Sequence, residues 1–407
     1  MTAVAAATPR FEVTISSRMI FLFAAACGII AANLYYAQPL IGPISATLGL
    51  APQAAGLIVT MTQIGYGVGL LLIVPLGDLV ENRRLIIIVV SFGALALLAA
   101  AFSARPLPFL AAMLCVGFGS VAVQILIPFA AHLAPDAARG RVVGNVTMGL
   151  MLGVMLSRPI SSFVTAFSSW HVVYLGSAFA MVALALVLGW ALPVRRPNAR
   201  LHYGELLLSM AELIRTTPIL RRRALYHSCL FGAFSLFWTT TPLLLAGPHF
   251  GFTQRGIALF ALAGVAGAIS APLAGRVADR DWSRPATALA MLLVACAFLL
   301  THIGRAGSPL SLALLVGAAI MLDFGVQANL VLGYRALFLL GAAYRSRING
   351  IYMASFFTAG ALGSAVGAWA YAEGGWSLAS WIGFALPIAA LLSFVAAEPR
   401  RITTARS

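Results

Sequence analysis

The chain has 407 residues, of which 61% are hydrophobic and only 9% are charged. An ordinary soluble domain has roughly 45–50% apolar and about 25% charged residues, and a soluble fold could not bury this much apolar surface. The composition therefore predicts an integral membrane protein. Each crossing uses about 20 apolar residues, so about a dozen crossings would occupy the chain and leave little for an extramembrane enzyme domain.

Apolar runs bounded by arginine, proline or glycine-rich breaks predict twelve transmembrane helices. Irregular backbone cannot face lipid, and the runs lack the alternating pattern of barrel strands. The first run is too long for a signal-peptide core, so we expect it to be retained as a span. The expected spans are 19–41, 54–77, 85–104, 107–132, 141–165, 172–193, 224–247, 256–275, 286–303, 309–334, 348–371 and 378–397.

These spans divide the chain into two halves of six helices each. The prediction is an all-α integral membrane fold of two pseudo-symmetric six-helix bundles. The expected parts are an N-terminal tail over 1–18, a first bundle over 19–193, a linker over 194–223, a second bundle over 224–397 and a C-terminal tail over 398–407.

The 26 basic residues are all arginines, and their positions predict the orientation of the chain. Positively charged loops stay on the cytoplasmic side of a membrane. With the N-terminus inside, 22 arginines lie on the inner side, while Arg105, Arg255 and Arg305 lie outside and Arg158 lies within a span. We therefore expect both termini and the linker in the cytoplasm. The net charge of +15 is then an orientation signal, and we expect no nucleic-acid binding.

The linker from Pro193 to Arg223 carries seven arginines and a helical pattern that ends before Pro218. Its apolar residues form one stripe, with charged residues off the stripe. Two interpretations are open: an amphipathic helix on the inner membrane surface, or a helix packed under the bundle as a tether.

Short motifs recur in equivalent loops of the two halves, which indicates an internal duplication. An Arg-x-Arg turn follows spans four and ten, a tryptophan precedes spans six and twelve, and an acidic and basic turn follows spans two and eight. The matched residues are Arg139 and Arg141 with Arg345 and Arg347, Trp170 with Trp376, and Asp78, Arg83 and Arg84 with Asp279 and Arg280.

Six plus six spans with these turns resemble the major facilitator superfamily. The stretches Ala32-Asn-Leu-Tyr-Tyr-Ala-Gln-Pro39 and Phe237-Trp238-Thr239-Thr240 resemble a bacterial branch near the drug:proton antiporters and sugar-efflux permeases. The resemblance implies a multi-pass rocker-switch transporter of the bacterial inner membrane. It also implies gating by the turn residues, which are Asp78, Arg83, Arg84, Asp279, Arg280, Arg139 and Arg141.

The chain departs from the antiporter motifs at three places. Gly77 directly precedes Asp78, whereas the usual turn has its glycine four residues before the acid. Met113 occupies the position where many proton antiporters have an arginine, and Arg158-Pro159 replaces the Gly-Pro of the antiporter signature. The coupling mechanism is therefore left open by the motifs.

Asp323 is the one acidic residue of the sequence that is predicted near the middle of a span, and Gln327 shares its helical face. A carboxylate in hydrocarbon costs several kcal/mol unless it faces water or a partner, so an acid there indicates a functional site. The alternative is a structural hydrogen bond to a neighbouring helix.

Arg158 lies within span five beside Pro159, which loosens the local helix. Arginine keeps its proton, so it is a poor proton carrier and a good anchor for an anionic ligand or a carboxylate. The alternative is that it snorkels to the outer interface. We hypothesise that rocking of the halves makes and breaks a contact between Arg158 and Asp323. When the two residues separate, Asp323 would take up a proton.

Polar residues in the cavity-lining spans are candidate ligand contacts. Spans one, four, seven and ten line the cavity in this superfamily, so Asn33, Tyr36, Gln38, Gln124 and Trp238 are candidates there. The two aromatic residues also fit a membrane-interface belt or core packing. We expect no metal site and no cofactor, because the sequence has neither a metal-ligand spacing nor a phosphate-binding Gly-Lys-Ser/Thr loop.

The leading prediction is a monomeric secondary transporter that exports a small organic molecule, driven by protons. Uptake by proton symport or facilitated diffusion is an alternative. A non-transporting sensor or a membrane enzyme is an alternative of another class. A sensor would carry a sizeable cytoplasmic domain, and an enzyme would cluster acidic, His or Ser residues at one depth, whereas Asp323 stands alone.

The charge distribution makes a testable prediction about topology. We expect a cysteine at Ser308, in a background without the four native cysteines, to react with an impermeant maleimide on intact cells. A cysteine at Ser209 should react only after the cells are permeabilised, because the linker is predicted to be cytoplasmic. The reverse labelling pattern would contradict the orientation.

Overall fold

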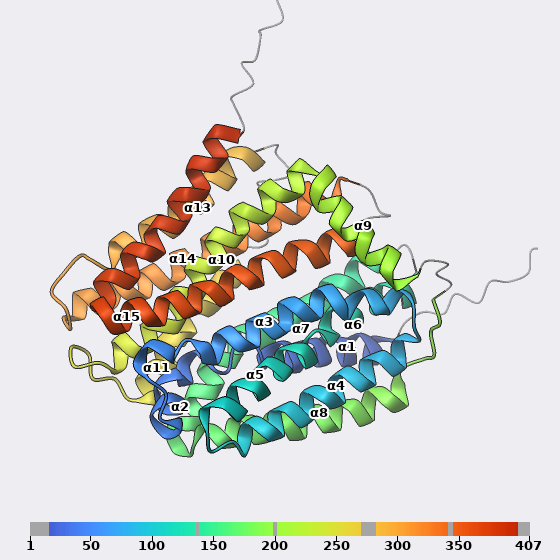
Figure 1. Cartoon of the computed structure of the whole chain (residues 1–407), viewed down its shortest axis with the longest axis horizontal. Helices are drawn as coiled ribbons and strands as arrows, with labels where there is room; N and C mark the ends of the chain where they lie inside the picture. Colours follow the sequence, from blue (N-terminus) through green and yellow to red (C-terminus); the bar gives the residue numbers. More distant parts are fainter. Residues whose placement is uncertain (1–15, 136–137, 198–201, 270–281, 341–344, 398–407) are drawn as a thin grey trace, which may run out of the picture.

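The computed structural model describes residues 16–135, 138–197, 202–269, 282–340 and 345–397. Its helices form two bundles, with the N-terminal one below and the C-terminal one above in Figure 1. The N-terminal bundle contains α1 (Ser17–Ala32), α2 (Ile41–Leu48), α3 (Leu57–Leu72), α4 (Asn82–Ala101), α5 (Pro106–Ser120), α6 (Ala122–Leu133), α7 (Arg139–Phe167) and α8 (Trp170–Ala191). The C-terminal bundle contains α10 (Pro218–Ala246), α11 (Gln254–Ala261), α13 (Ser283–Leu300), α14 (Pro309–Phe338) and α15 (Arg345–Ala397).

Nine helical stretches among the described residues are long and apolar enough to cross a membrane. One of them, α15, contains both predicted spans eleven and twelve. The shorter apolar helices Ser17–Ala32 and Gln254–Val265 lie where spans one and eight are predicted. The all-α membrane fold is confirmed, and these elements are consistent with twelve spans.

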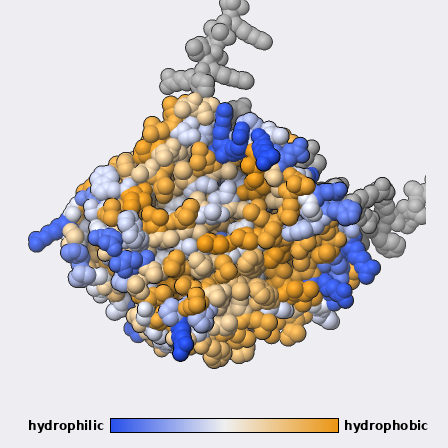
Figure 2. All heavy atoms as spheres, viewed as in Figure 1, coloured by the Kyte–Doolittle hydropathy of each residue, from blue (hydrophilic) through white to orange (hydrophobic). Residues whose placement is uncertain are grey.

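The surface has the distribution of side chains that a membrane protein requires. Large apolar side chains such as Phe21, Leu186 and Trp190 are exposed on the outside of the helices. Figure 2 shows apolar residues across the middle of the molecule and hydrophilic ones gathered at the ends, more densely at the end near α9. Such a belt buries its apolar surface in lipid rather than in a protein core.

The first span is longer and less regular than predicted. The helix α1 ends at Ala32, and the chain continues through turns to the 3₁₀ helix η1 (Gln38–Leu40) and then α2, which ends at Leu48 rather than near residue 41. Pro39 and Pro43 lack the backbone N–H that a continuous helix needs. This break decides which side chains of the segment face the other bundle.

The chain changes direction within α15 at Gly374 and Gly375, as the red helices of Figure 1 show. Gly375 has a φ of 61°, which glycine adopts without the steric cost that a Cβ would add. In span eight, α11 is followed by the 3₁₀ helix η4 (Leu262–Ile269). The rest of that predicted span, 270–275, lies outside the described residues.

The bundles meet where α3 and α15 run side by side (Figure 1). Two hydrogen bonds from polar side chains cross this contact, and a third joins α3 to α10. Thr60 donates to the carbonyl of Ala361 at 2.9 Å, and Ser364 donates to the carbonyl of Gly56 at 3.1 Å. Gln63 of α3 donates to Ser235 of α10 at 2.9 Å. These neutral bonds join the two halves along one line.

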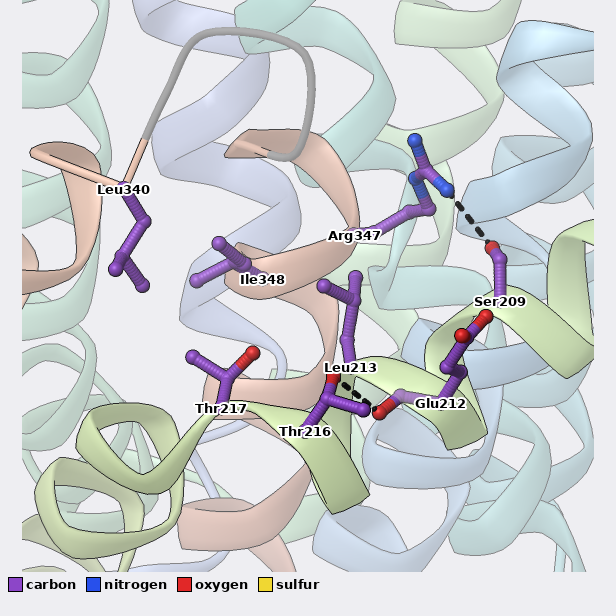
Figure 3. A pocket seen from close by; sticks show the side chains of 8 residues that line it. All are labelled: Ser209, Glu212, Leu213, Thr216, Thr217, Leu340, Arg347 and Ile348. Carbon is purple, nitrogen blue, oxygen red and sulfur yellow. Dashed lines mark hydrogen bonds between the residues drawn. The ribbon is translucent and has the colours of Figure 1, made fainter.

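The linker helix α9 (Tyr203–Thr216) packs against the ends of both bundles. The Tyr203 hydroxyl donates to the carbonyl of Leu72 at the end of α3, and Arg347 at the start of α15 donates to Ser209 at 2.9 Å. Figure 3 shows this second bond at the edge of a cavity of about 330 Å³ between α9 and α15. Leu206 and Met210 of α9 are buried. These contacts fit the interpretation of the linker as a packed tether.

Glycines allow α1 and α7 to approach closely. A Cβ at Gly153 of α7 would lie 2.1 Å from the Gly28 carbonyl oxygen, and one at Gly149 would lie 2.3 Å from that of Ala24. Without side chains at these positions the two backbones can pack directly, as small residues permit in membrane helices. This contact fixes the position of α7, which carries Arg158.

The close approach predicts different effects for two glycines of the same helix. We expect Gly153→Ala to lower the free energy of unfolding by about 1–3 kcal/mol, because the new methyl group overpacks the contact. Gly144→Ala is the control, since nothing lies within 4 Å of a Cβ at Gly144. Thermal melting of both variants in detergent measures the difference, and equal melting temperatures would contradict the contact.

Candidate functional site

Arg158 lies inside the protein rather than at the membrane interface. It is carried by α7, and only 2% of its surface is exposed. Three aromatic rings surround the guanidinium carbon, with ring centres at 5.3 Å for Tyr35, 5.0 Å for Phe234 and 4.3 Å for Trp238. Because the faces of aromatic rings attract cations, these rings stabilise the buried charge. The alternative that Arg158 snorkels to the interface does not fit this position.

Gln38 binds the Nε–H group of the Arg158 side chain. The Arg158 Nε donates to the Gln38 Oε1 at 2.6 Å, and the Gln38 side chain is fully buried. The bend between α1 and α2 places Gln38 on η1, where it faces α7. The same bend turns Tyr35, rather than Tyr36, toward Arg158.

Asp323 comes from the other bundle and lies close to Arg158. It is carried by α14, and 4% of its surface is exposed. A Cβ at Gly264 of η4 would lie 3.0 Å from Asp323 Oδ2, 3.0 Å from Trp238 Cζ2 and 3.2 Å from Arg158 Nη1. The charged atoms are thus at most about 6 Å apart, where opposite charges attract strongly in a low-dielectric interior. The structure therefore brings together the two intramembrane charges of the sequence.

Four polar atoms around this point have no hydrogen-bond partner. They are Arg158 Nη2, Gln38 Nε2, Trp238 Nε1 and Asp323 Oδ2. Buried polar atoms in proteins are nearly always hydrogen-bonded, and an unsatisfied one costs about 1–3 kcal/mol. These atoms converge between the two bundles, beside the backbone of Gly264, which makes them candidates for contact with polar groups of a ligand. We call these four residues, with Gly264, the charge site.

The other predicted ligand contacts lie elsewhere. Asn33 accepts a hydrogen bond from Ser177 of α8 and is buried within the N-terminal bundle. Tyr36 is half-buried and lines a groove between α1 and α7. Gln327 is half-buried one helical turn beyond Asp323.

Gln124 belongs to a hydrogen-bonded chain that crosses between the bundles. Its Nε2 donates to the Tyr66 hydroxyl at 3.1 Å, and its Oε1 accepts from Asn349 of α15 at 3.3 Å. The Tyr66 ring also packs on Phe357 of α15, with ring centres 4.5 Å apart. Gln124 thus contributes to the contact between the halves in this structure.

The predicted gating residues of the first half lie at the ends of helices. Asp78 is exposed at the end of η3 (Val74–Asp78), within the electrostatic influence of Arg195 and Arg347. Arg83 donates to the carbonyl of Gly189, and Arg139 donates to that of Ala131 at 3.1 Å. Arg84 and Arg141 are exposed, and Asp279 and Arg280 lie outside the described residues.

Several buried or half-buried polar residues were not anticipated from the sequence. Gln63 and Asn349 hydrogen-bond across the two bundles, and His227 pairs with Asn329 at 3.1 Å inside the C-terminal bundle. The only sequence signal for these residues was a polar side chain within an apolar run. That signal does not show which neighbouring helix the side chain faces. Gly264 carried no signal, because its role depends on the three side chains that surround it.

Comparison with known proteins decides the family. The model of the Major Facilitator Superfamily matches residues 20–334 of the chain. The chain belongs to the Major Facilitator Superfamily. The transporter YgaY of Escherichia coli O157:H7 is 36% identical over 363 residues, covering 89% of this chain and 91% of YgaY. A transporter of Streptomyces coelicolor is 31% identical over 362 residues, covering 87% and 82% of the two chains.

More distant similarities agree with this family. A chloramphenicol efflux pump of Mycobacterium tuberculosis is 24% identical over 258 residues, which cover 60% of this chain and 59% of the pump. The solved structure of the nucleoside transporter NupG has a TM-score of 0.75 at 16% identity, covering 93% and 99% of the chains. A D-xylose–proton symporter has a TM-score of 0.70 at 15% identity, covering 92% and 96%. The resemblance drawn from the sequence is confirmed: the protein is a multi-pass membrane transporter and not an enzyme.

The charge site predicts energetic coupling between Arg158 and Asp323. Arg158→Gln and Asp323→Asn should each lower the melting temperature, because each leaves the opposite charge buried with fewer partners. The double variant should lose less than the sum of the single variants, with a coupling energy of about 0.5–3 kcal/mol. A double-mutant cycle from denaturation of the detergent-solubilised protein measures this coupling.

The control pairs Arg158→Gln with Asn329→Ala. Asn329 is buried on the same helix as Asp323 but lies six residues, or about 9 Å, further along α14. The change in the free energy of unfolding caused by Asn329→Ala should therefore add to the change caused by Arg158→Gln. Additivity in both pairs would show that the two charges do not interact.

Proposed function

We propose that the protein is a proton-coupled exporter of a small organic molecule, acting as a monomer in the inner membrane of a bacterium with both termini in the cytoplasm. The observation that carries the proposal is the charge site. It joins a permanent cation on the N-terminal bundle to an acid on the C-terminal bundle, within reach of polar atoms that lack partners.

The charge site suggests how proton binding is linked to movement. While the bundles are arranged as in this structure, Arg158 compensates the charge of Asp323. When the bundles rock apart, an isolated carboxylate in an apolar surrounding is neutralised by taking up a proton. Protonation then favours the arrangement in which the two residues are separated, and deprotonation favours the arrangement in which they meet.

Export is favoured over uptake by one relative. The chloramphenicol pump of Mycobacterium tuberculosis is named for efflux, and it matches 60% of this chain. The same charge site would also serve a symporter, because the direction depends on whether the substrate crosses the membrane in the same step as the proton or in the opposite step. Transport in vesicles of known orientation distinguishes the two directions.

Asp323→Asn tests the coupling. In everted membrane vesicles with an imposed pH gradient, we expect this variant to lose at least about ten-fold in gradient-driven accumulation, because its amide cannot exchange a proton. Exchange of labelled for unlabelled substrate should continue, because exchange needs the bundles to move but not the proton. Chloramphenicol is the first substrate to screen, followed by small charged metabolites.

The matched control is Glu373→Gln, which makes the same acid-to-amide change outside the charge site. Glu373 accepts a hydrogen bond from Gln53 at 3.3 Å near the turn within α15, and its replacement should leave gradient-driven transport intact. If the Asp323→Asn protein still concentrates substrate using the proton gradient, Asp323 is structural and the coupling site lies elsewhere.

A further inference from the structure

Among the unpartnered atoms of the charge site, hydrogen-bond donors outnumber acceptors. Arg158 Nη2 and Gln38 Nε2 are donors on the Arg158 side, and Trp238 Nε1 is a donor that lies beside Asp323 Oδ2, the single acceptor. A complementary ligand offers several acceptor atoms to one side of the site and a donor to the other. From this inventory we propose that the charge site binds a small zwitterion. Its anionic group would face Arg158 and its protonated amine would face Asp323.

This assignment rests on the proposed function in one respect, because it takes the charge site as the substrate site. It goes further by naming the substrate class. A carboxylate matches the donor side, since it accepts several hydrogen bonds and pairs well with a guanidinium. An ammonium group matches Asp323, because it supplies donors and a compensating charge.

The charge balance disfavours ligands of a single sign while Asp323 is ionised. A cation alone would compensate Asp323 but would sit within about 6 Å of the Arg158 charge, which repels it at low dielectric. An anion alone would compensate Arg158 and meet the same repulsion from an ionised Asp323. A zwitterion adds no net charge to the buried site, and each of its ends replaces part of the attraction between the two residues.

The aromatic residues direct the approach of the ligand and supply an apolar wall. Three rings surround the guanidinium carbon, and Gln38 occupies Nε. The unpartnered Nη2 is therefore a point at which a ligand acceptor can bind Arg158. Phe260 packs on Trp238 with ring centres 5.9 Å apart, so the wall continues toward η4. An apolar body attached to the zwitterion would pack against these rings.

Gly264 lets the side chains of both charges pack directly against the backbone of η4. A Cβ there would lie 3.0 Å from the Asp323 carboxylate and 3.2 Å from Arg158 Nη1, which is closer than ordinary contact. A valine at this position would place atoms where the ligand must bridge the two charges. Gly317 of α14 provides a matched control, since nothing lies within 4 Å of a Cβ there.

The test uses three probes with the same phenyl body and different charges. Phenylalanine carries both charges, 3-phenylpropanoate carries only the negative one, and 2-phenylethylamine carries only the positive one. Titration calorimetry on the purified full-length protein in detergent measures the three affinities. We expect phenylalanine to bind at least ten-fold more tightly than either single-charge probe.

Variants assign each end of the ligand. Asp323→Asn should weaken phenylalanine at least ten-fold and leave 3-phenylpropanoate unweakened, because the amine loses its partner and the anion loses a repelling charge. Arg158→Gln should weaken phenylalanine and 3-phenylpropanoate but not 2-phenylethylamine. Gly264→Val should abolish binding of phenylalanine, whereas Gly317→Val and Asn329→Ala should preserve it.

Three results would overturn the assignment. These are tightest binding of either single-charge probe, failure of all three probes to bind, and chloramphenicol binding that exceeds that of phenylalanine and is unchanged by Asp323→Asn and Arg158→Gln. The outcome is separable from that of the proposed function, because binding in detergent needs no proton gradient. Phenylalanine binding without gradient-driven transport would refute the coupling alone, and Asp323-dependent transport of a non-zwitterion would refute the substrate class alone.

Discussion

The burial of two opposite charges in an apolar bundle is the constraint on which the rest of the site depends. Arg158 and Asp323 are almost fully enclosed, and each ion would cost several kcal/mol in such a place without compensation. The surrounding residues are explained by this cost. Gln38 binds the guanidinium edge, three rings surround its carbon, and Gly264 lets the carboxylate come near.

The contacts between the bundles are of two kinds, and the difference determines how the halves can move. Along α3 and α15 the bonds are neutral, from Thr60, Gln63 and Ser364. Each contributes about 0.5–1.5 kcal/mol, so a small rotation can exchange one for another at little cost. At the charge site the attraction is ionic and depends on separation. Under the proposed mechanism, the weak neutral bonds would act as the hinge, and a proton or a ligand would bias the movement through the ionic contact.

The sequence identified the fold and the two central residues because both leave strong one-dimensional signals. Membrane spans are recognised as long apolar runs. A charged residue within such a run is recognised from the sequence whichever way its side chain faces. Gly264 was missed for a physical reason, and the sequence could not decide between Tyr35 and Tyr36. The helix ends at Ala32, so helical spacing no longer describes residues 33–37 and does not show which of the two rings faces Arg158. Gly264 matters through the atoms that come near it, and proximity between η4, α7 and α14 is set by packing of elements far apart in the chain.

The distribution of partners between the bundles bears on the separation of the two charges that the proposed mechanism requires. Gln38 and Tyr35 belong to the N-terminal bundle, so they would travel with Arg158 when the halves rock. Trp238 belongs to the C-terminal bundle and lies against Asp323, so its indole would travel with the acid. Each charge therefore keeps a polar or aromatic neighbour from its own half. Neither group would be left without such a neighbour when the two charges separate. The contact across the bundles is then the part that changes, and the proton or the ligand needs to replace only that part.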